Sequence, residues 1–75
     1  MKSEIFCIRL REIRKKQGHT LQSLGSQIGM KKSSLGNIER GDKAPSLDTV
    51  IALADTLNIS IDYLLGRIDD PILRK

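Results

Sequence analysis

Residues 20–41 read TLQSLGSQIGMKKSSLGNIERG and contain two short segments whose apolar residues recur every three or four positions. These apolar positions are Leu21, Leu24, Ile28, Leu35 and Ile38. Such spacing places one buried stripe on each of two helices. Gly29 and Gly41 follow the stripes, and glycine readily closes a helix in the left-handed conformation. The segment predicts two short helices joined by a glycine turn, and we expect Gly25 where these helices cross at close range.

The flanking sequence predicts three more helices. One covers Ser3–Gln17, with Gly18 as its stop, and its inward residues are Phe6, Leu10 and Ile13. A fourth helix follows the N-cap Ser46 and ends at Asn58. Its inward residues are expected to be Leu47, Val50, Ile51, Ala54 and Leu57. A short fifth helix begins at Ser60 and ends at Gly66, so the sequence predicts an all-α domain over residues 1–66 and a C-terminal tail over residues 67–75.

Length and composition limit the classes of protein to consider. The 75 residues leave room for one domain with a small core. The single cysteine, Cys7, cannot form an internal disulfide, and no Cys/His cluster has the spacing of a zinc site, so we expect no metal and no cofactor. No apolar run approaches the roughly 20 residues of a membrane span. We expect a cytoplasmic protein. We also expect that it is not an enzyme, since His19 is the only histidine and no serine, histidine and aspartate form a nucleophile, base and orienting group.

Charge is distributed unevenly along the chain. Residues 1–43 contain ten basic and four acidic residues, a net charge of +6, whereas residues 44–75 contain three basic and five acidic residues, a net charge of −2. The basic half includes the two helices joined by the glycine turn. A polyanion is therefore the expected partner of that half, although a solvated charged surface would show the same imbalance.

Residues 14–41 resemble the helix-turn-helix of the Cro and lambda-repressor (XRE) family. The matching positions are Gly18, Thr20, Leu24, Gly29, Ser33, Ile38, Glu39, Arg40 and Gly41. Pro45-Ser46-Leu47, the turn at residues 57–60 and Asp62-Tyr63-Leu64-Leu65-Gly66 extend the similarity to Phe6–Gly66. The resemblance implies a compact five-helix lambda-repressor-like fold. Its second and third helices would form the helix-turn-helix, and its third helix would enter the major groove of DNA.

The third helix presents one arc away from its apolar stripe. The arc consists of Lys32, Ser33, Gly36, Asn37 and Arg40. Lys32 is suited to donate to guanine O6 and N7, Ser33 to several bases, and Asn37 to make the bidentate contact with adenine N6 and N7. We expect Lys32, Ser33 and Asn37 to contact bases, and the bare Gly36 to let the backbone sit deeper in the groove.

Other residues are expected to contact phosphates. Thr20 and the free N–H groups at the start of the second helix, beginning with Leu21, would bind an anion at the positive helix end. Arg40 and Lys43 would reach the DNA backbone on the other side, as loop residues of the family do. Relatives commonly carry glutamine where Leu21 stands, so the side chain at this position cannot make the polar interaction that glutamine would.

Arg14 and Glu39 match a pair that in relatives forms a partly buried ion pair between the first and third helices. Ordinary surface charges are the alternative interpretation. Lys31 stands where a capping serine or threonine is usual, and its side chain cannot cap the third helix.

The leading hypothesis is a sequence-specific transcriptional regulator, a repressor of phage, prophage or mobile-element type, acting on a double-stranded DNA operator. The alternative is a protein-interaction module such as an antitoxin-like partner. We expect no membrane partner, and the sequence contains no sign of a site for a small-molecule effector. We expect a homodimer on DNA, with Leu65, Ile68, Ile72 and Leu73 as the candidate interface. These four residues would otherwise cover the base of the core or belong to a disordered tail.

Overall fold

The computed structural model describes residues 3–72, and these residues form five helices and no strand. The helices are α1 (Ser3–Lys16), α2 (Leu21–Gln27), α3 (Lys32–Glu39), α4 (Leu47–Leu57) and α5 (Ile61–Leu64). The all-α, five-helix prediction is confirmed, with helix ends within a residue or two of those expected. Within the described part of the chain, no helix is long and apolar enough to span a membrane.

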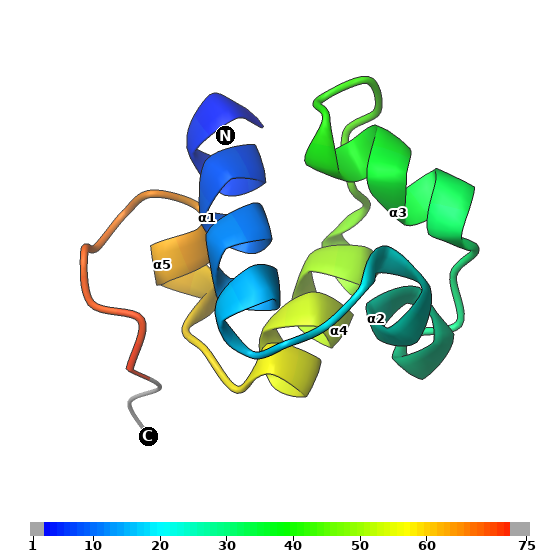
Figure 1. Cartoon of the computed structure of the whole chain (residues 1–75). Helices are drawn as coiled ribbons and strands as arrows, with labels where there is room; N and C mark the ends of the chain where they lie inside the picture. Colours follow the sequence, from blue (N-terminus) through cyan, green and yellow to red (C-terminus); the bar gives the residue numbers. More distant parts are fainter. Residues whose placement is uncertain (1–2, 73–75) are drawn as a thin grey trace.

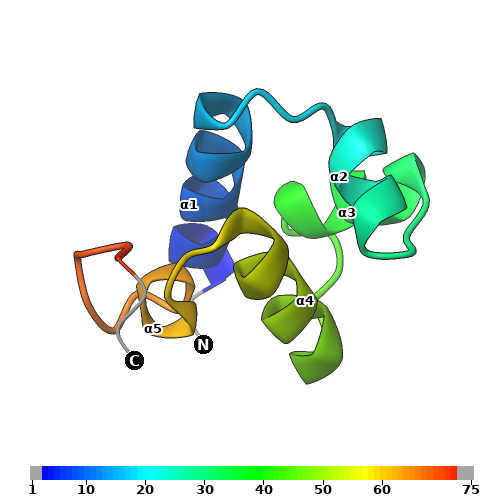
Figure 2. The same cartoon turned by 90° about the horizontal axis from the view of Figure 1, so that it is seen from below.

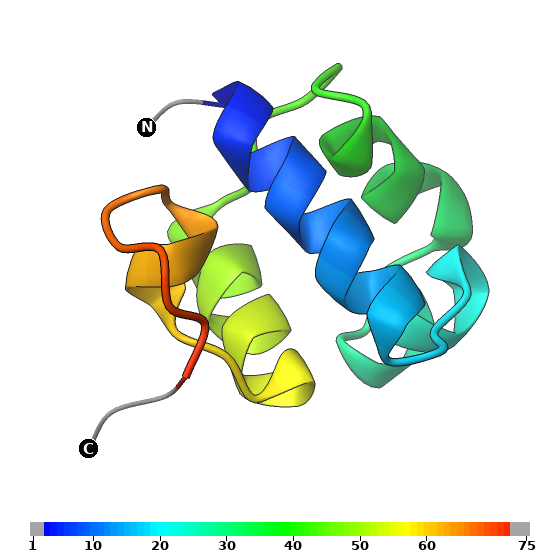
Figure 3. The same ribbon diagram turned by 60° about the vertical axis from the view of Figure 1, so that its left-hand side comes forward.

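The helices pack around one apolar core. α1 contacts both α3 and α5, α2 contacts α3, and α4 contacts α5 (Figures 1 and 3). The core side chains are Phe6, Leu10, Ile13, Leu24, Leu35, Ile38, Val50, Leu53, Ala54, Leu57, Ile59 and Leu64. α2 and α3 lie together on one side of the molecule, and α5 lies on the opposite side (Figures 1 and 2). This arrangement separates the helix-turn-helix from the C-terminal segment.

Capping side chains set where three of the helices begin. The hydroxyl groups of Thr20, Ser46 and Ser60 accept hydrogen bonds from backbone N–H groups three residues further on, at 3.0, 3.1 and 3.3 Å. Each bond satisfies a donor that has no partner inside its own helix. Lys31 precedes α3 without a side-chain cap, as the sequence predicts. Asn58 ends α4 in the left-handed conformation, with φ of 56°.

The prediction of which α4 residues face inward is wrong for two residues at the edge of the apolar stripe. Leu47 is 71% exposed and Ile51 is 39% exposed, whereas Leu53, which was not among the predicted inward residues, is fully buried. The buried stripe is Val50, Leu53, Ala54 and Leu57. Ile51 lies about 100° around the helix from Val50, and Leu47 is one turn before Ile51 on the same edge, so neither side chain points to the core.

The segment after α5 is attached to the domain. The N–H of Arg67 donates to the Asp62 carbonyl at 2.8 Å, and the N–H of Ser60 donates to the Pro71 carbonyl at 3.0 Å. Arg9 of α1 donates to the carbonyls of Tyr63 and Ile68, at 2.6 and 2.7 Å. Residues 67–72 therefore fold back along α5 and α1 (Figure 3).

Candidate nucleic-acid interface

The outer surface of α3 carries the side chains predicted to contact bases. Lys32 and Ser33 are exposed in the first turn of the helix, and Asn37 is half-buried one turn later. The opposite face of α3 is fixed in the core through Leu35 and Ile38. The helix thus presents polar side chains outward from a buried apolar base, which is the form required of a helix that enters the major groove.

A tight turn holds α2 against α3. The carbonyl of Gly25 accepts hydrogen bonds from the N–H groups of Ile28 and Met30, at 3.1 and 2.8 Å. A Cβ on Gly25 would lie 2.7 Å from the Met30 carbonyl oxygen, closer than real Cβ atoms come. The close approach expected at Gly25 is therefore present, but it is made with the returning backbone of the turn. Gly29 supplies the bend, with φ of +72°.

The start of α2 contains a reciprocal cap. Thr20 Oγ1 accepts from the N–H of Ser23, and Ser23 Oγ accepts from the N–H of Thr20, both at 3.0 Å. The N–H groups of Leu21 and Gln22 belong to the first turn, where an α-helix supplies no internal acceptor. The Leu21 side chain is half-buried and packs against the core, so the polar group that this residue presents at the helix end is its backbone N–H.

The structure brings Arg14 and Glu39 together. Nε and Nη2 of Arg14 donate to the two carboxylate oxygens of Glu39, each at 2.8 Å. The residues are only 9% and 4% exposed, and the hydrogen bonds with Glu39 raise the pKa of Arg14. Arg14 also donates to the His19 carbonyl at 2.9 Å, and Arg11 approaches Glu39 at 3.5 Å. This buried pair ties α1 to the C-terminal end of α3.

The loop after α3 is tied to the same helix. The N–H groups of Asp42 and Lys43 both donate to the Asn37 carbonyl, at 2.9 and 3.3 Å. Lys43 is exposed, and its backbone position is fixed relative to Asn37. The predicted phosphate contact and the predicted base contact thus belong to one rigid unit.

Arg40 folds back over α3. Its Nη2 donates to Asn37 Oδ1 at 2.5 Å, and its Nε donates to Asp42 Oδ2 at 3.1 Å. A Cβ on Gly36 would lie 3.1 Å from Nη1 of Arg40 and 3.7 Å from Cδ1 of Leu21. Gly36, which the sequence places on the outward arc of the helix, is buried beneath these two side chains in the free protein.

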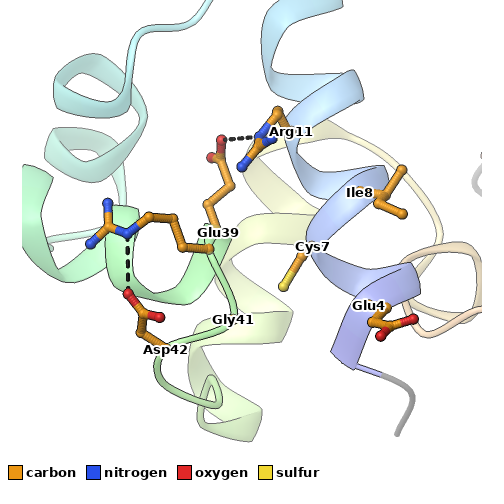
Figure 4. Close-up of a pocket in the computed structure, with 8 residues that line it drawn as sticks. Glu4, Cys7, Ile8, Arg11, Glu39, Gly41 and Asp42 are labelled. Atoms are coloured by element: carbon orange, nitrogen blue, oxygen red, sulfur yellow. Dashed lines mark hydrogen bonds and ion pairs between the residues drawn. The ribbon is translucent and has the colours of Figure 1, made fainter.

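A hollow separates the N-terminal half of α1 from the loop after α3 (Figure 4). The Cys7 side chain points into it, and its thiol donates to the Ile38 carbonyl at 3.3 Å. Burial raises the pKa of Cys7, so the thiol is not activated as a nucleophile. Arg11 and Glu39 form an ion pair at one edge of this hollow. Arg40 and Asp42 form a second ion pair at another edge (Figure 4).

The segment that carries the candidate dimer residues Leu65, Ile68 and Ile72 lies on the side of the molecule opposite α2 and α3 (Figure 1). Leu65 is half-buried against the core, Ile68 is 37% exposed, and Ile72 is 65% exposed. Leu73 lies outside the described residues.

Among residues 3–72, no group of three or more His, Cys, Asp or Glu side chains is placed to hold a metal ion.

Sequence reasoning missed the roles of two arginines that organise this structure. Arg9 holds the segment after α5, through the hydrogen bonds given above, an ion pair with Asp69 at 3.0 Å and a position 4.2 Å from the centre of the Tyr63 ring. Arg40 was expected to contact phosphate, and its hydrogen bond to Asn37 was not foreseen. An arginine in sequence carries no sign of a partner sixty residues away.

The helix-turn-helix family HTH_3 matches residues 10–64, which include the whole of the helix-turn-helix geometry described above. The chain belongs to this family. The HTH_3 domain is 43% identical over 67 residues to a Bacillus subtilis protein described as the uncharacterized HTH-type transcriptional regulator YobD, covering 89% of this chain and 60% of that one. It is 36% identical over 59 residues to the cryptic phage CTXphi transcriptional repressor RstR of Vibrio cholerae, covering 79% of this chain and 53% of that one. The HTH_3 domain thus spans little more than half the length of these two relatives.

Among solved structures, the HTH_3 domain is similar to the P22 c2 repressor in complex with synthetic operator 9T. The TM-score is 0.78 at 30% sequence identity, over 84% of this chain and 96% of that one. The similarity therefore covers most of the chain, and the lambda-repressor-like fold expected from the sequence is confirmed.

Proposed function

We propose that this protein is a sequence-specific DNA-binding transcriptional regulator, a repressor of phage, prophage or mobile-element type that inserts α3 into the major groove. The observation that carries the proposal is the rigid mounting of α3: its polar face is outward while the Arg14–Glu39 pair and the core fix the other side. A preorganised helix loses little conformational freedom on binding. The P22 c2 repressor, which shares this fold, was solved with an operator.

In this proposal Lys32, Ser33 and Asn37 contact base edges, and a second group of residues contacts phosphates. That group consists of Thr20, Leu21, Arg40 and Lys43. The net charge of +6 over residues 1–43 supports binding of a polyanion at this half of the chain. In this proposal the protein acts in the cytoplasm and needs neither metal nor cofactor for this role.

We further propose that two copies bind one operator with two-fold symmetry. One recognition helix covers only a few base pairs, whereas two helices about 34 Å apart reach successive major grooves. Leu65, Ile68, Ile72 and Leu73 are the proposed contact between copies, and the exposure of Ile72, in the segment that folds back along α5, supports this choice.

The test is selection of bound sites from a random oligonucleotide pool, followed by footprinting and sedimentation of the saturated complex. We expect an enriched, near-palindromic sequence with two protected half-sites one helical turn apart and two chains per operator. A pool without enrichment would reject sequence-specific binding. A single half-site occupied by one chain would reject the dimer while leaving base recognition intact.

A further inference from the structure

The guanidinium of Arg40 connects the side-chain amide of Asn37 to the loop after α3. Nη2 donates to Asn37 Oδ1 at 2.5 Å, and Nε donates to Asp42 Oδ2 at 3.1 Å. The guanidinium lies over Gly36, where an added Cβ would come within 3.1 Å of Nη1. The missing side chain at position 36 therefore provides the space that Arg40 occupies.

This hydrogen bond determines which way the Asn37 amide faces. A guanidinium carries donors only, so the amide atom next to Nη2 has to be the oxygen. The amide nitrogen, with its two N–H donors, is the part that Arg40 does not engage. Hydrogen bonds with one charged partner are roughly twice as strong as neutral ones. The amide is thus oriented in the free protein.

The loop that anchors Arg40 is itself fixed to Asn37. The N–H groups of Asp42 and Lys43 both donate to the Asn37 carbonyl, so Asp42 keeps its position relative to the amide. The side chains of Arg40 and Asp42 are each more than half exposed, and such pairs contribute little to stability. The effect of Arg40 is therefore on orientation, and replacing it should leave the fold intact.

We propose that Arg40 is a positioning residue that holds Asn37 as a hydrogen-bond donor, so that Asn37 selects guanine. The major-groove edge of guanine offers two acceptors, N7 and O6, and no donor. Adenine also has a donor, N6, which in the bidentate contact needs the amide oxygen. Arg40 already uses one of the two lone pairs of that oxygen, and its guanidinium occupies the space beside it, so adenine is disfavoured there. This inference rests on the proposed function and replaces adenine with guanine as the base expected opposite Asn37.

The first test needs no DNA. In the isotope-labelled full chain, the side-chain amide signals of Asn37 are compared between wild type and Arg40→Met, which keeps an unbranched stem of similar length but carries no donors. We expect these signals to shift, and the matched control Arg67→Met, which removes another exposed arginine paired with an aspartate, to leave them in place. Unchanged signals in Arg40→Met would overturn the positioning role.

The second test is selection from a random pool with wild type, Arg40→Met and Asn37→Ala. The base pair read by residue 37 is the one whose preference disappears in Asn37→Ala. At this base pair we expect wild type to enrich guanine over adenine by about tenfold. We expect Arg40→Met to lose this preference and to enrich adenine as well. If Arg40 also binds a phosphate, its replacement would weaken binding to all sequences alike and leave the preference readable.

The outcomes separate two failures. Adenine enriched by wild type at this position, or guanine retained by Arg40→Met, would overturn the inference. Amide signals that shift as expected in a protein that enriches no sequence would overturn the proposed function and, with it, the base assignment.

Discussion

Replacing Glu39 by alanine removes the carboxylate that accepts two hydrogen bonds from Arg14, each at 2.8 Å. Arg14 would remain nine-tenths buried without its charged partner, and breaking a buried pair in this way costs about 3–5 kcal/mol. Arg14→Ala should cost less, about 2–3 kcal/mol, because Glu39 would still have Arg11 at 3.5 Å. The double variant leaves neither charge stranded. Its loss should fall short of the sum of the single losses by about 1–3 kcal/mol.

Wild type, the two single variants and the double variant form a double-mutant cycle. Urea unfolding of these four proteins, followed by circular dichroism at the helix band, measures the coupling energy between Arg14 and Glu39. The matched control is the Arg67–Asp62 pair, whose atoms are 3.9 Å apart and whose side chains are both more than half exposed. Its coupling should be below about 0.5 kcal/mol, as for most surface pairs. Losses that add strictly in the Arg14–Glu39 cycle, or a coupling no larger than the control's, would refute the argument that the buried pair fixes α3 to α1.

Three further predictions concern other parts of the fold. Gly25→Ala should lower the free energy of unfolding by about 1–3 kcal/mol, despite a gain in helix propensity, because its Cβ would meet the Met30 carbonyl oxygen at 2.7 Å; an unchanged urea midpoint would contradict this. Arg9→Met should speed tryptic cleavage after Arg67, since it removes the donors that hold residues 67–72; an unchanged cleavage rate would show that other contacts suffice. Cys7 should react with iodoacetamide more slowly in the native protein than in urea at the same mildly alkaline pH, because burial raises its pKa and lowers the thiolate fraction. Equal rates would contradict this shift.

Helix positions were predictable because local chemistry sets them. Thr20, Ser46 and Ser60 each have a hydroxyl where a helix needs an N-terminal acceptor, and all three caps form. Gly29 and Gly41 have positive φ, as expected of glycines that end helices. These signals act over three or four residues and therefore need no knowledge of the tertiary structure.

The inward face of α4 was predicted less well, because several apolar residues on one helix compete for the core. Leu47, Ile51 and Leu53 are chemically similar, and only packing against the other helices decides which is buried. The same reason explains Gly36, which was placed on the outward arc of α3 but is buried. Whether a bare backbone lies open depends on what covers it, and here Arg40 does so from one turn away.

Long side chains were the least predictable part of the candidate site. Arg9 reaches Asp69 across the fold, and Arg40 donates hydrogen bonds to Asn37 and Asp42 while more than half of its side chain stays exposed. Flexible cations can satisfy their donors in many ways, so their partners follow from the assembled geometry. The Arg14–Glu39 pair was predictable only because of the resemblance to relatives.

The central claim is that α3 reads bases while the adjoining loop contacts the DNA backbone. The most direct test is to measure how Asn37→Ala and Lys43→Ala bind selected and random DNA across a series of salt concentrations. Asn37→Ala should weaken binding to the selected operator by about 1–3 kcal/mol and leave random DNA unaffected. Lys43→Ala should weaken both equally and reduce the slope of log K against log salt by about 1. Equal losses on operator and random DNA for Asn37→Ala would contradict the account.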